Sequence, residues 1–292
     1  METTLRKPLM IKHYLLLTKP GIILGNALTT AGGYALAARG RFDLGLFLPM
    51  VLGLGLIIAS ACVFNNYIDR NHDARMNRTK CRALARGIIP HRKALLFGTG
   101  LGLLGTLTLA IGTNILTTCV ALTGFFFYVI VYSLSKYQTT YGTLIGSIAG
   151  AIPPVVGYTT AARTLDLGAL ILFAIIAMWQ MPHFFAIAIY RLGDYTKASI
   201  PVFPYVKGMR KTKVHMTAYL LAFILATALL TLCGYTTSTF MLIMALVGTS
   251  WLILALKGFS AKNDARWARK MFIFSLVVVM TLSVTLPFTT AS

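Results

Sequence analysis

The chain has 292 residues, of which 57% are hydrophobic and only 12% are charged, and its mean hydropathy is +0.75. Soluble domains carry about 25% charged residues, so this composition excludes a soluble globular protein. The apolar stretches are continuous over about 18 to 23 residues, which is typical of membrane-spanning helices and unlike the short alternating strands of a β-barrel. We therefore expect an all-α integral membrane protein.

Nine stretches are long and apolar enough to span a bilayer. The first follows a segment that contains Pro8 and Pro20 and is long for the basic part of a signal peptide, so we expect it to be retained. The fifth contains Pro153-Pro154, a pair that bends a helix and is tolerated where the segment faces protein instead of lipid. In chain order the stretches cover residues 21–38, 44–66, 94–112, 114–134, 143–161, 168–190, 215–233, 238–256 and 271–289.

The net charge of +20 is distributed unevenly. Of the 27 lysines and arginines, 24 fall in the N-terminal segment and in every second loop, and three fall in the opposite loops. Because positive charge marks the cytoplasmic side, we expect a cytoplasmic N-terminus, an external C-terminus and a location in the cell (inner) membrane. This distribution explains the basicity and disfavours nucleic-acid binding. The four cysteines show no spacing typical of a disulfide or a metal site.

Only seven residues are acidic, and three of them follow spans on the predicted cytoplasmic side. Asp69 and Asp73 come directly after the second span, and Asp194 comes directly after the sixth. If the second helix continues, Asn65, Asp69 and Asp73 stand at i, i+4 and i+8, so their oxygens point to one side. Like charges four residues apart repel each other, which indicates that a cation accompanies them.

Oxygen donors without a thiolate suit Mg²⁺, which takes one or two carboxylates together with water and phosphate oxygens. Basic residues suited to the same anion follow at once, at Arg75, Arg78, Lys80 and Arg82. The sequence therefore predicts a magnesium–diphosphate site at the mouth of the second span, on the cytoplasmic side. The alternative is a set of solvated loop charges beside anionic lipid headgroups.

The segment after the sixth span repeats this arrangement, with Asp194 flanked by Arg191 and Lys197 four spans beyond Asp69. Such a repeat predicts one transmembrane domain of two four-helix halves plus a ninth helix, with the site between the halves. Alternatively, Asp194 is only an ion-pair partner of a neighbouring basic residue. The domain covers 1–292, the halves about 21–134 and 143–256, and the ninth helix 271–289.

Two histidines lie near these features. His183, in "WQMPHFF" (179–185), is the only histidine inside a predicted span, where an ionisable group indicates function. A hydrogen-bonded histidine between helices, beside a kink at Pro182, is the alternative. On a continuing helix His72 lies close to the face of Asn65, but imidazole favours softer metals, so we expect His72 beside the site and not as a ligand.

The motif Asn-x-x-x-Asp-x-x-x-Asp, followed by "RTKCRAL" (78–84), resembles the UbiA-type intramembrane aromatic prenyltransferase superfamily. Within it, "TKPGIILGN" (18–26), "NNYIDR" (65–70), "WQMPHFF" and "DYTKASIPVFP" (194–204) resemble the protoheme IX farnesyltransferases. The likeness runs from about residue 12 to the last span. Three positions depart from the expected pattern. Ala83 replaces a usual proline, Asn71-His72 is unusually polar, and Ala198 stands where other branches have a second aspartate.

This resemblance implies nine helices around a central cavity, with Mg²⁺-bound farnesyl diphosphate held by both aspartate motifs. By position, the metal and catalytic residues are Asn65, Asp69, Asp73 and Asp194, and the diphosphate contacts include Arg78, Arg82 and Lys197.

The resemblance further implies that farnesyl is transferred to a vinyl group of heme B, with addition of water, to give heme O. His183 would then orient or ligate the heme, and heme-copper oxidase assembly would supply partners. The rivals are a prenyltransferase acting on an aromatic quinone precursor and a membrane transporter that uses the same basic loops.

Overall fold

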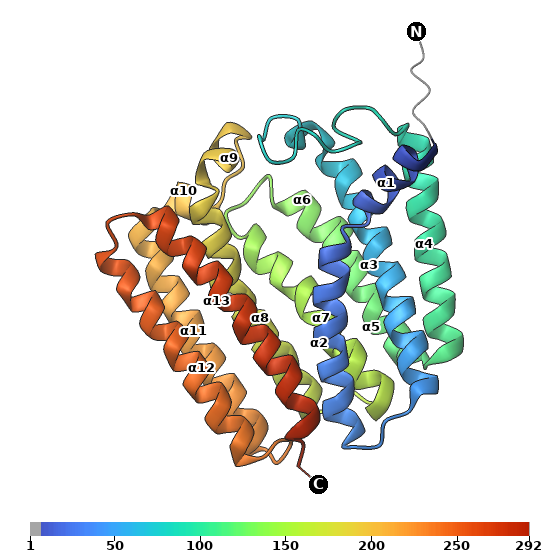
Figure 1. The fold of residues 1–292 in the computed structure, drawn as a ribbon. Helices are drawn as coiled ribbons and strands as arrows, with labels where there is room; N and C mark the ends of the chain where they lie inside the picture. The colour runs from blue at the N-terminus through green and yellow to red at the C-terminus, as the bar shows by residue number, and fades with distance from the viewer. Residues whose placement is uncertain (1–6, 292) are drawn as a thin grey trace.

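The structure, a computed structural model, describes residues 7–291, and Figure 1 shows them as a bundle of long helices. Within this range nine helices are long and apolar enough to cross a membrane. The nine predicted spans are thus confirmed, and the chain is an all-α, multi-pass membrane protein. The spans are α2 (Pro20–Ala38), α3 (Leu44–Asp73), α4 (His91–Gly112), α5 to α6 (Ile115–Ser135), α7 (Gly142–Ala162), α8 (Leu167–Tyr190), α11 (Met209–Leu232), α12 with its last turn (Ser238–Ser260) and α13 with its last turn (Asp264–Phe288).

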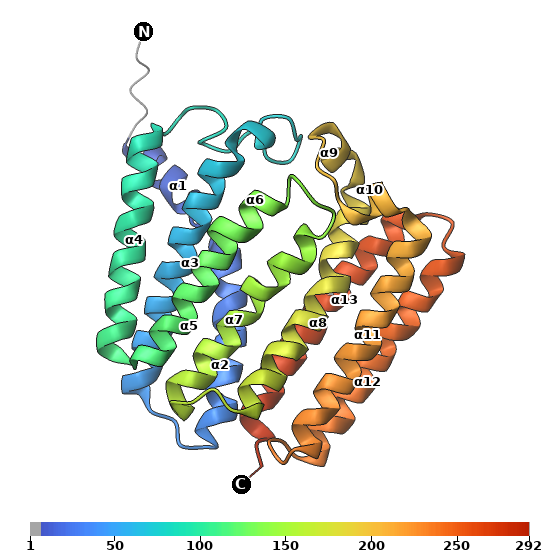
Figure 2. The same ribbon diagram turned by 180° about the vertical axis from the view of Figure 1, so that it is seen from behind.

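Three short helices lie outside the spans: α1 (Lys7–Leu17), α9 (Leu192–Lys197) and α10 (Phe203–Lys207). All three lie at one end of the bundle, together with the α3–α4 loop, and the C-terminus lies at the other end (Figures 1 and 2). We call the first of these the α1 end. Residues 1–6 lie outside the described range, and the cytoplasmic side of the N-terminus, the central cavity and the division into halves stay predictions.

The second span differs from its predicted length, because α3 continues from residue 66 to Asp73. Its N-cap is Asp43, whose carboxylate accepts a hydrogen bond from the backbone N–H of Gly45. Its last turns carry buried polar side chains, and Asn66 donates to the backbone oxygen of Leu17 at 2.9 Å. One continuous helix therefore carries the whole Asn65–Asp69–Asp73 motif.

Helices α2 and α7 cross at two glycines. A Cβ atom added to Gly33 would lie 2.0 Å from the backbone oxygen of Pro154, and one added to Gly157 would lie 2.0 Å from that of Thr30. Pro153 and Pro154 are both buried inside an unbroken α7. The expectation that the proline pair faces protein is confirmed.

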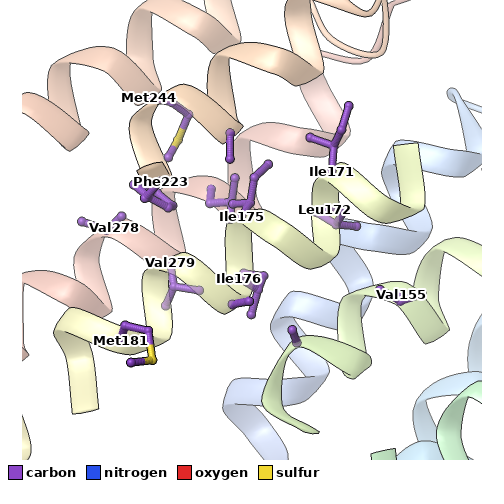
Figure 3. Packing of buried hydrophobic residues seen from close by; sticks show 14 of the residues in the cluster. Val155, Ile171, Leu172, Ile175, Ile176, Met181, Phe223, Met244, Val278 and Val279 are labelled. Carbon is purple, nitrogen blue, oxygen red and sulfur yellow. The ribbon is translucent and has the colours of Figure 1, made fainter. Parts of the chain in front are cut away.

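Helix α8 forms the centre of the second part of the bundle and packs against α7, α11 and α13. Figure 3 shows Ile175 and Ile176 of α8 in one buried cluster with Phe223 of α11 and Val278 and Val279 of α13. Burial on several sides explains why this span is apolar around its whole circumference.

Substituting Gly33 tests the α2–α7 crossing. We expect Gly33→Ala to lower the midpoint of thermal unfolding in detergent, since overpacking against a backbone oxygen costs about 1–3 kcal/mol. Gly100→Ala in α4 is the matched control, because a Cβ there meets nothing within 4 Å. Equal midpoints for the two variants would contradict the close approach.

Candidate functional site

Asp69 is buried at the α1 end of α3 and is held by two residues from the end of the fourth span. The Lys136 ammonium lies 2.6 Å from its carboxylate, and the Tyr137 hydroxyl donates to it, also at 2.6 Å. A carboxylate removed from water needs such charge-assisted partners. Asp69 is therefore neutralised by a residue 67 positions away in the sequence.

Asp73, one turn further along α3, is neutralised by a residue of the loop that follows this helix. The Arg82 guanidinium donates to the Asp73 carboxylate at 2.7 Å, and the Thr79 hydroxyl donates to the Asp73 backbone oxygen at 3.1 Å. The chain thus turns back after α3 and brings Arg82 over the motif. Asp73 is 2% exposed, whereas Arg82 remains partly accessible to solvent.

Asn65 joins the motif to two further segments. Its side-chain oxygen accepts from the Lys19 ammonium at 2.8 Å, and its amide donates to Ser133 at 3.3 Å. Lys19 stands directly before α2 with φ of 52°, a left-handed conformation that a lysine rarely adopts and that costs of order 1–3 kcal/mol. This conformation accompanies the turn that brings the ammonium to Asn65.

A π-helical segment, Phe127–Tyr132, lies directly before Ser133 and Lys136. The wider turn adds a residue and changes the direction of every side chain that follows it, and such insertions are frequent at functional sites. Ser133 and Lys136 both reach α3, through Asn65 and Asp69 respectively. The π-helical segment therefore sets which face of the fourth span meets the motif.

Burial lowers the pKa of the Lys19 ammonium to about 8 and also lowers the pKa of Lys136, in spite of the opposing charge of Asp69. Both groups lie just outside the membrane-spanning segments. Desolvation disfavours the charged form of a lysine, so both ammonium groups would gain from an added anion. The site thus combines two buried carboxylates with three cations, Lys19, Lys136 and Arg82.

The second motif reaches the first through an apolar contact. Met76, in the loop after α3, packs against Ala198 and Ile200, in the segment after α9. Ala198 is only 1% exposed, so the position that departs from other branches of the superfamily is a buried contact between the two loops. Burial raises the pKa of Tyr195, and the charges of Arg78 and Asp194 act on its hydroxyl in opposite directions.

The predicted site residues are therefore only partly brought together. Asn65, Asp69, Asp73 and Arg82 share contacts in one cluster, whereas no side-chain hydrogen bond or ion pair joins Asp194 or Arg78 to it among the described residues. Lys197 is exposed at the end of α9, and the structure shows no contact from it to Asp69 or Asp73. The roles of Asp194, Arg78 and Lys197 stay predictions.

Among residues 7–291, no three histidine, cysteine, aspartate or glutamate side chains gather as metal ligands do. Asp69 and Asp73 nevertheless fit Mg²⁺ by donor chemistry, since Mg²⁺ is bound through one or two carboxylates with phosphate oxygens and water. His72 stacks on the Tyr137 ring at 3.8 Å between centroids. It therefore contacts the ring that holds Asp69, which agrees with a place beside the site.

His183 lies away from these charges, between α8 and α13. Its Nδ1 is 2.6 Å from the Ser275 hydroxyl, and its ring stacks on Trp179 with centroids 4.8 Å apart. The interhelical hydrogen bond that was the alternative for this histidine is thus present, and it does not exclude a role for the second ring nitrogen.

Three contact residues were missing from the sequence-based site: Lys19, Lys136 and Tyr137. Lys19 stands within "TKPGIILGN", which was recognised as a motif without a role for its lysine. Lys136 is the only basic residue in the predicted 135–142 loop, and this isolation at the end of a span was the available signal.

A sequence model of the UbiA prenyltransferase family matches residues 26–277, most of the chain. The chain belongs to the UbiA prenyltransferase family. A protoheme IX farnesyltransferase of Protochlamydia amoebophila is 50% identical over 279 residues, which cover 96% of this chain and 99% of the relative. Another, of Edwardsiella ictaluri, is 51% identical over 276 residues, covering 94% and 93%. The resemblance inferred from the motifs is confirmed, and this UbiA family member is a prenyltransferase.

Solved structures of the family share the fold. A digeranylgeranylglyceryl phosphate synthase superposes with a TM-score of 0.78 at 16% identity, covering 95% of this chain and 99% of that one. A UbiA homologue of Archaeoglobus fulgidus, bound to GPP and Mg²⁺, superposes with a TM-score of 0.69 at 16% identity, covering 94% and 99%. At 16% identity these superpositions show that the chain shares the fold of these structures.

The Asp69–Lys136 pair can be tested by a double-mutant cycle. We expect Lys136→Met to destabilise the protein by about 3 kcal/mol, because it leaves a buried carboxylate without its cation. Asp69→Asn combined with Lys136→Met should recover most of that loss. Thermal unfolding in detergent measures both effects, and strictly additive losses would show that the two side chains do not interact.

Ala198 can be tested as a contact between the two motif loops. We expect Ala198→Asp to separate the loops, since it buries a carboxylate against Met76, and to speed proteolysis of residues 74–90. Ser199→Asp is the matched control, because Ser199 is exposed and its left-handed φ of 56° suits aspartate. Similar cleavage rates in both variants would be inconsistent with the packing of Ala198.

Proposed function

We propose that this UbiA family member transfers the farnesyl group of farnesyl diphosphate to a vinyl group of heme B, with addition of water, and so produces heme O. One observation carries the proposal: the paired carboxylates and the three cations converge at the α1 end of α3, in a chain half identical to protoheme IX farnesyltransferases over nearly its full length. A prenyl diphosphate has a polar head and an apolar tail, which suits a charged cluster at the end of apolar helices.

Different residues would bind the metal ion and the diphosphate. Asp69 and Asp73, with Asn65, would hold Mg²⁺, which when bound supplies positive charge to the leaving diphosphate. Lys136 and Arg82 are already placed at these carboxylates, so a small shift of either cation would bring it to a phosphate oxygen. Lys19 carries no carboxylate partner among the described residues and adds a further charge at Asn65.

In the reaction, the allylic C–O bond of farnesyl diphosphate breaks and the diphosphate leaves with the electron pair. The cations at the site stabilise this developing charge, an effect that is strongest where water is scarce. A new C–C bond joins the farnesyl carbon to the vinyl group, and water adds to the resulting cation and releases a proton. Because water is the final nucleophile, the chain need not supply a strong base.

The remaining assignments follow from the same proposal. Asp194, Arg78 and Lys197 would complete the diphosphate site from the second motif, and His183 would contact the heme. The site would open on the cytoplasmic side of the cell membrane, as the charge distribution predicts. Heme O would then pass to heme-copper oxidase assembly. An aromatic quinone precursor is the rival acceptor, and the product decides between the two.

The proposed reaction is tested in membranes with heme B, farnesyl diphosphate and Mg²⁺, with the product identified by mass. We expect a farnesylated and hydrated heme from the wild type, and a rate at least about 100-fold lower from Asp69→Asn, because the leaving charge loses its counterion site. A chelator should abolish the product and added Mg²⁺ should restore it.

Asp43→Asn is the matched control, since Asp43 caps the opposite end of the same helix and asparagine is an equally good cap. If a product formed from 4-hydroxybenzoate and not from heme B, the acceptor would be a quinone precursor and not heme. Folded protein that releases no diphosphate with either acceptor would leave transport as the function to test.

A further inference from the structure

The turn that joins α12 to α13 lies at the α1 end, at the outer edge of the bundle and across it from α3 and α4 (Figures 1 and 2). Residues 257–270 contain five lysines and arginines and a single acid, Asp264. The Asp264 carboxylate is already paired with the Lys213 ammonium of α11, at 2.5 Å. Among the described residues, none of the five cations of the turn has an ion-pair partner, so the turn keeps a surplus of positive charge.

Four of these five cations line one open cavity, which we call the α12–α13 cavity. It has a volume of about 300 Å³ and lies between the end of α12 and the first turns of α13. No acidic residue is among the described residues that line it. Its cations are Lys257, Lys262, Arg266 and Lys270, and its apolar wall includes Leu254 and Trp267.

Trp267, which is buried beneath this cavity lining, is fixed from several sides. Its indole N–H donates to the backbone oxygen of Leu254 at 2.9 Å, and the Lys213 ammonium lies 5.3 Å from its ring centre. Lys213 also donates to the backbone oxygen of Gly258 at 2.7 Å. A Cβ atom added to Gly258 would lie 2.3 Å from the Trp267 ring, so the contact requires a glycine. These contacts hold the end of α12 and the start of α13 together and give the cavity a fixed shape.

The face of α13 that carries two of the cavity cations continues as an exposed apolar stripe. From Arg266, the positions i+4, i+7, i+11, i+14 and i+18 lie within about 40° of one another on a helix. The first of these is Lys270, and the other four are exposed apolar residues: Ile273, Val277, Met280 and Val284. In a helix that crosses a bilayer, such a stripe faces acyl chains. A ligand with a phosphate at the cavity and acyl chains along α13 therefore matches this face better than a free anion does.

We propose that the α12–α13 cavity binds the phosphate headgroup of an anionic phospholipid, with Arg266 and Lys270 as phosphate contacts and the acyl chains lying along the exposed stripe of α13. Arginine and lysine form charge-assisted hydrogen bonds with phosphate oxygens, and basic pockets between membrane helices are typical sites for such headgroups. The bound lipid would anchor the outer α12–α13 hairpin at the membrane surface. This site is separate from the Asp69 cluster and does not depend on the proposed reaction.

The test is a titration of the full chain in a neutral detergent with phosphatidylglycerol or with phosphatidylcholine of the same acyl chains, with bound lipid counted by native mass spectrometry. Wild type should bind phosphatidylglycerol at least about 10-fold more tightly, because its headgroup has a net negative charge. Arg266→Gln should weaken that binding about 5-fold, and adding Lys270→Gln should weaken it about 5-fold again. Binding of phosphatidylcholine should stay the same.

Arg269→Gln is the matched control, since Arg269 is exposed on the same helix but does not line the cavity. It removes the same charge as Arg266→Gln and should leave the affinity for phosphatidylglycerol unchanged. Equal losses in the two variants would overturn the proposal, because net charge and not the cavity would then hold the lipid. Equal affinities of wild type for the two lipids would overturn it as well.

Inorganic phosphate separates a lipid headgroup from a free anion. We expect millimolar phosphate to leave the binding of phosphatidylglycerol unchanged, because phosphate lacks the acyl chains that would contact α13. Displacement of the lipid by phosphate in wild type would assign the cavity to a soluble anion and overturn the proposal. The membrane assay with heme B measures the proposed reaction independently, so the failure of one proposal is distinguishable from the failure of the other.

Discussion

Two carboxylates at the end of an apolar helix remain charged only if cations accompany them, and much of the candidate site follows from this constraint. Asp69 takes Lys136 from the end of the fourth span, and Asp73 takes Arg82 from the loop that follows it. Each pairing fixes a piece of chain that would otherwise be free at the membrane surface. Under the proposed function the same cations would be available to the substrate, because a diphosphate can replace the carboxylates as their partner.

Close packing of helices stabilises the part of the bundle that carries this cluster of charges. Glycines 33 and 157 allow α2 and α7 to touch backbone to backbone, and Gly32 allows α2 to touch α13. The backbones of α2 and α13 are thereby close toward the C-terminal end and diverge toward the α1 end (Figure 1).

Much of this could be predicted from local sequence. Span number follows from apolar run length, and the acidic motif follows from the rarity and spacing of its carboxylates. The end of α3 was placed too early, because Asn65, Asn66 and Asp69 lower the apolar signal although the helix continues. Lys136, Tyr137 and Lys19 were missed because their contacts span more than 40 positions in the sequence, which no local spacing shows.

The sequence by itself determined the membrane class, the nine helices, the family and the residues of the first motif, since each of these depends on composition or on spacing within one helix. Only the tertiary structure decided which cation neutralises which carboxylate, that Ala198 joins the two motif loops, and that His183 pairs with Ser275 of another helix. These depend on the directions of side chains on different helices. Such directions are set by how the helices cross and by the π-helical turn, and neither is encoded in the local pattern.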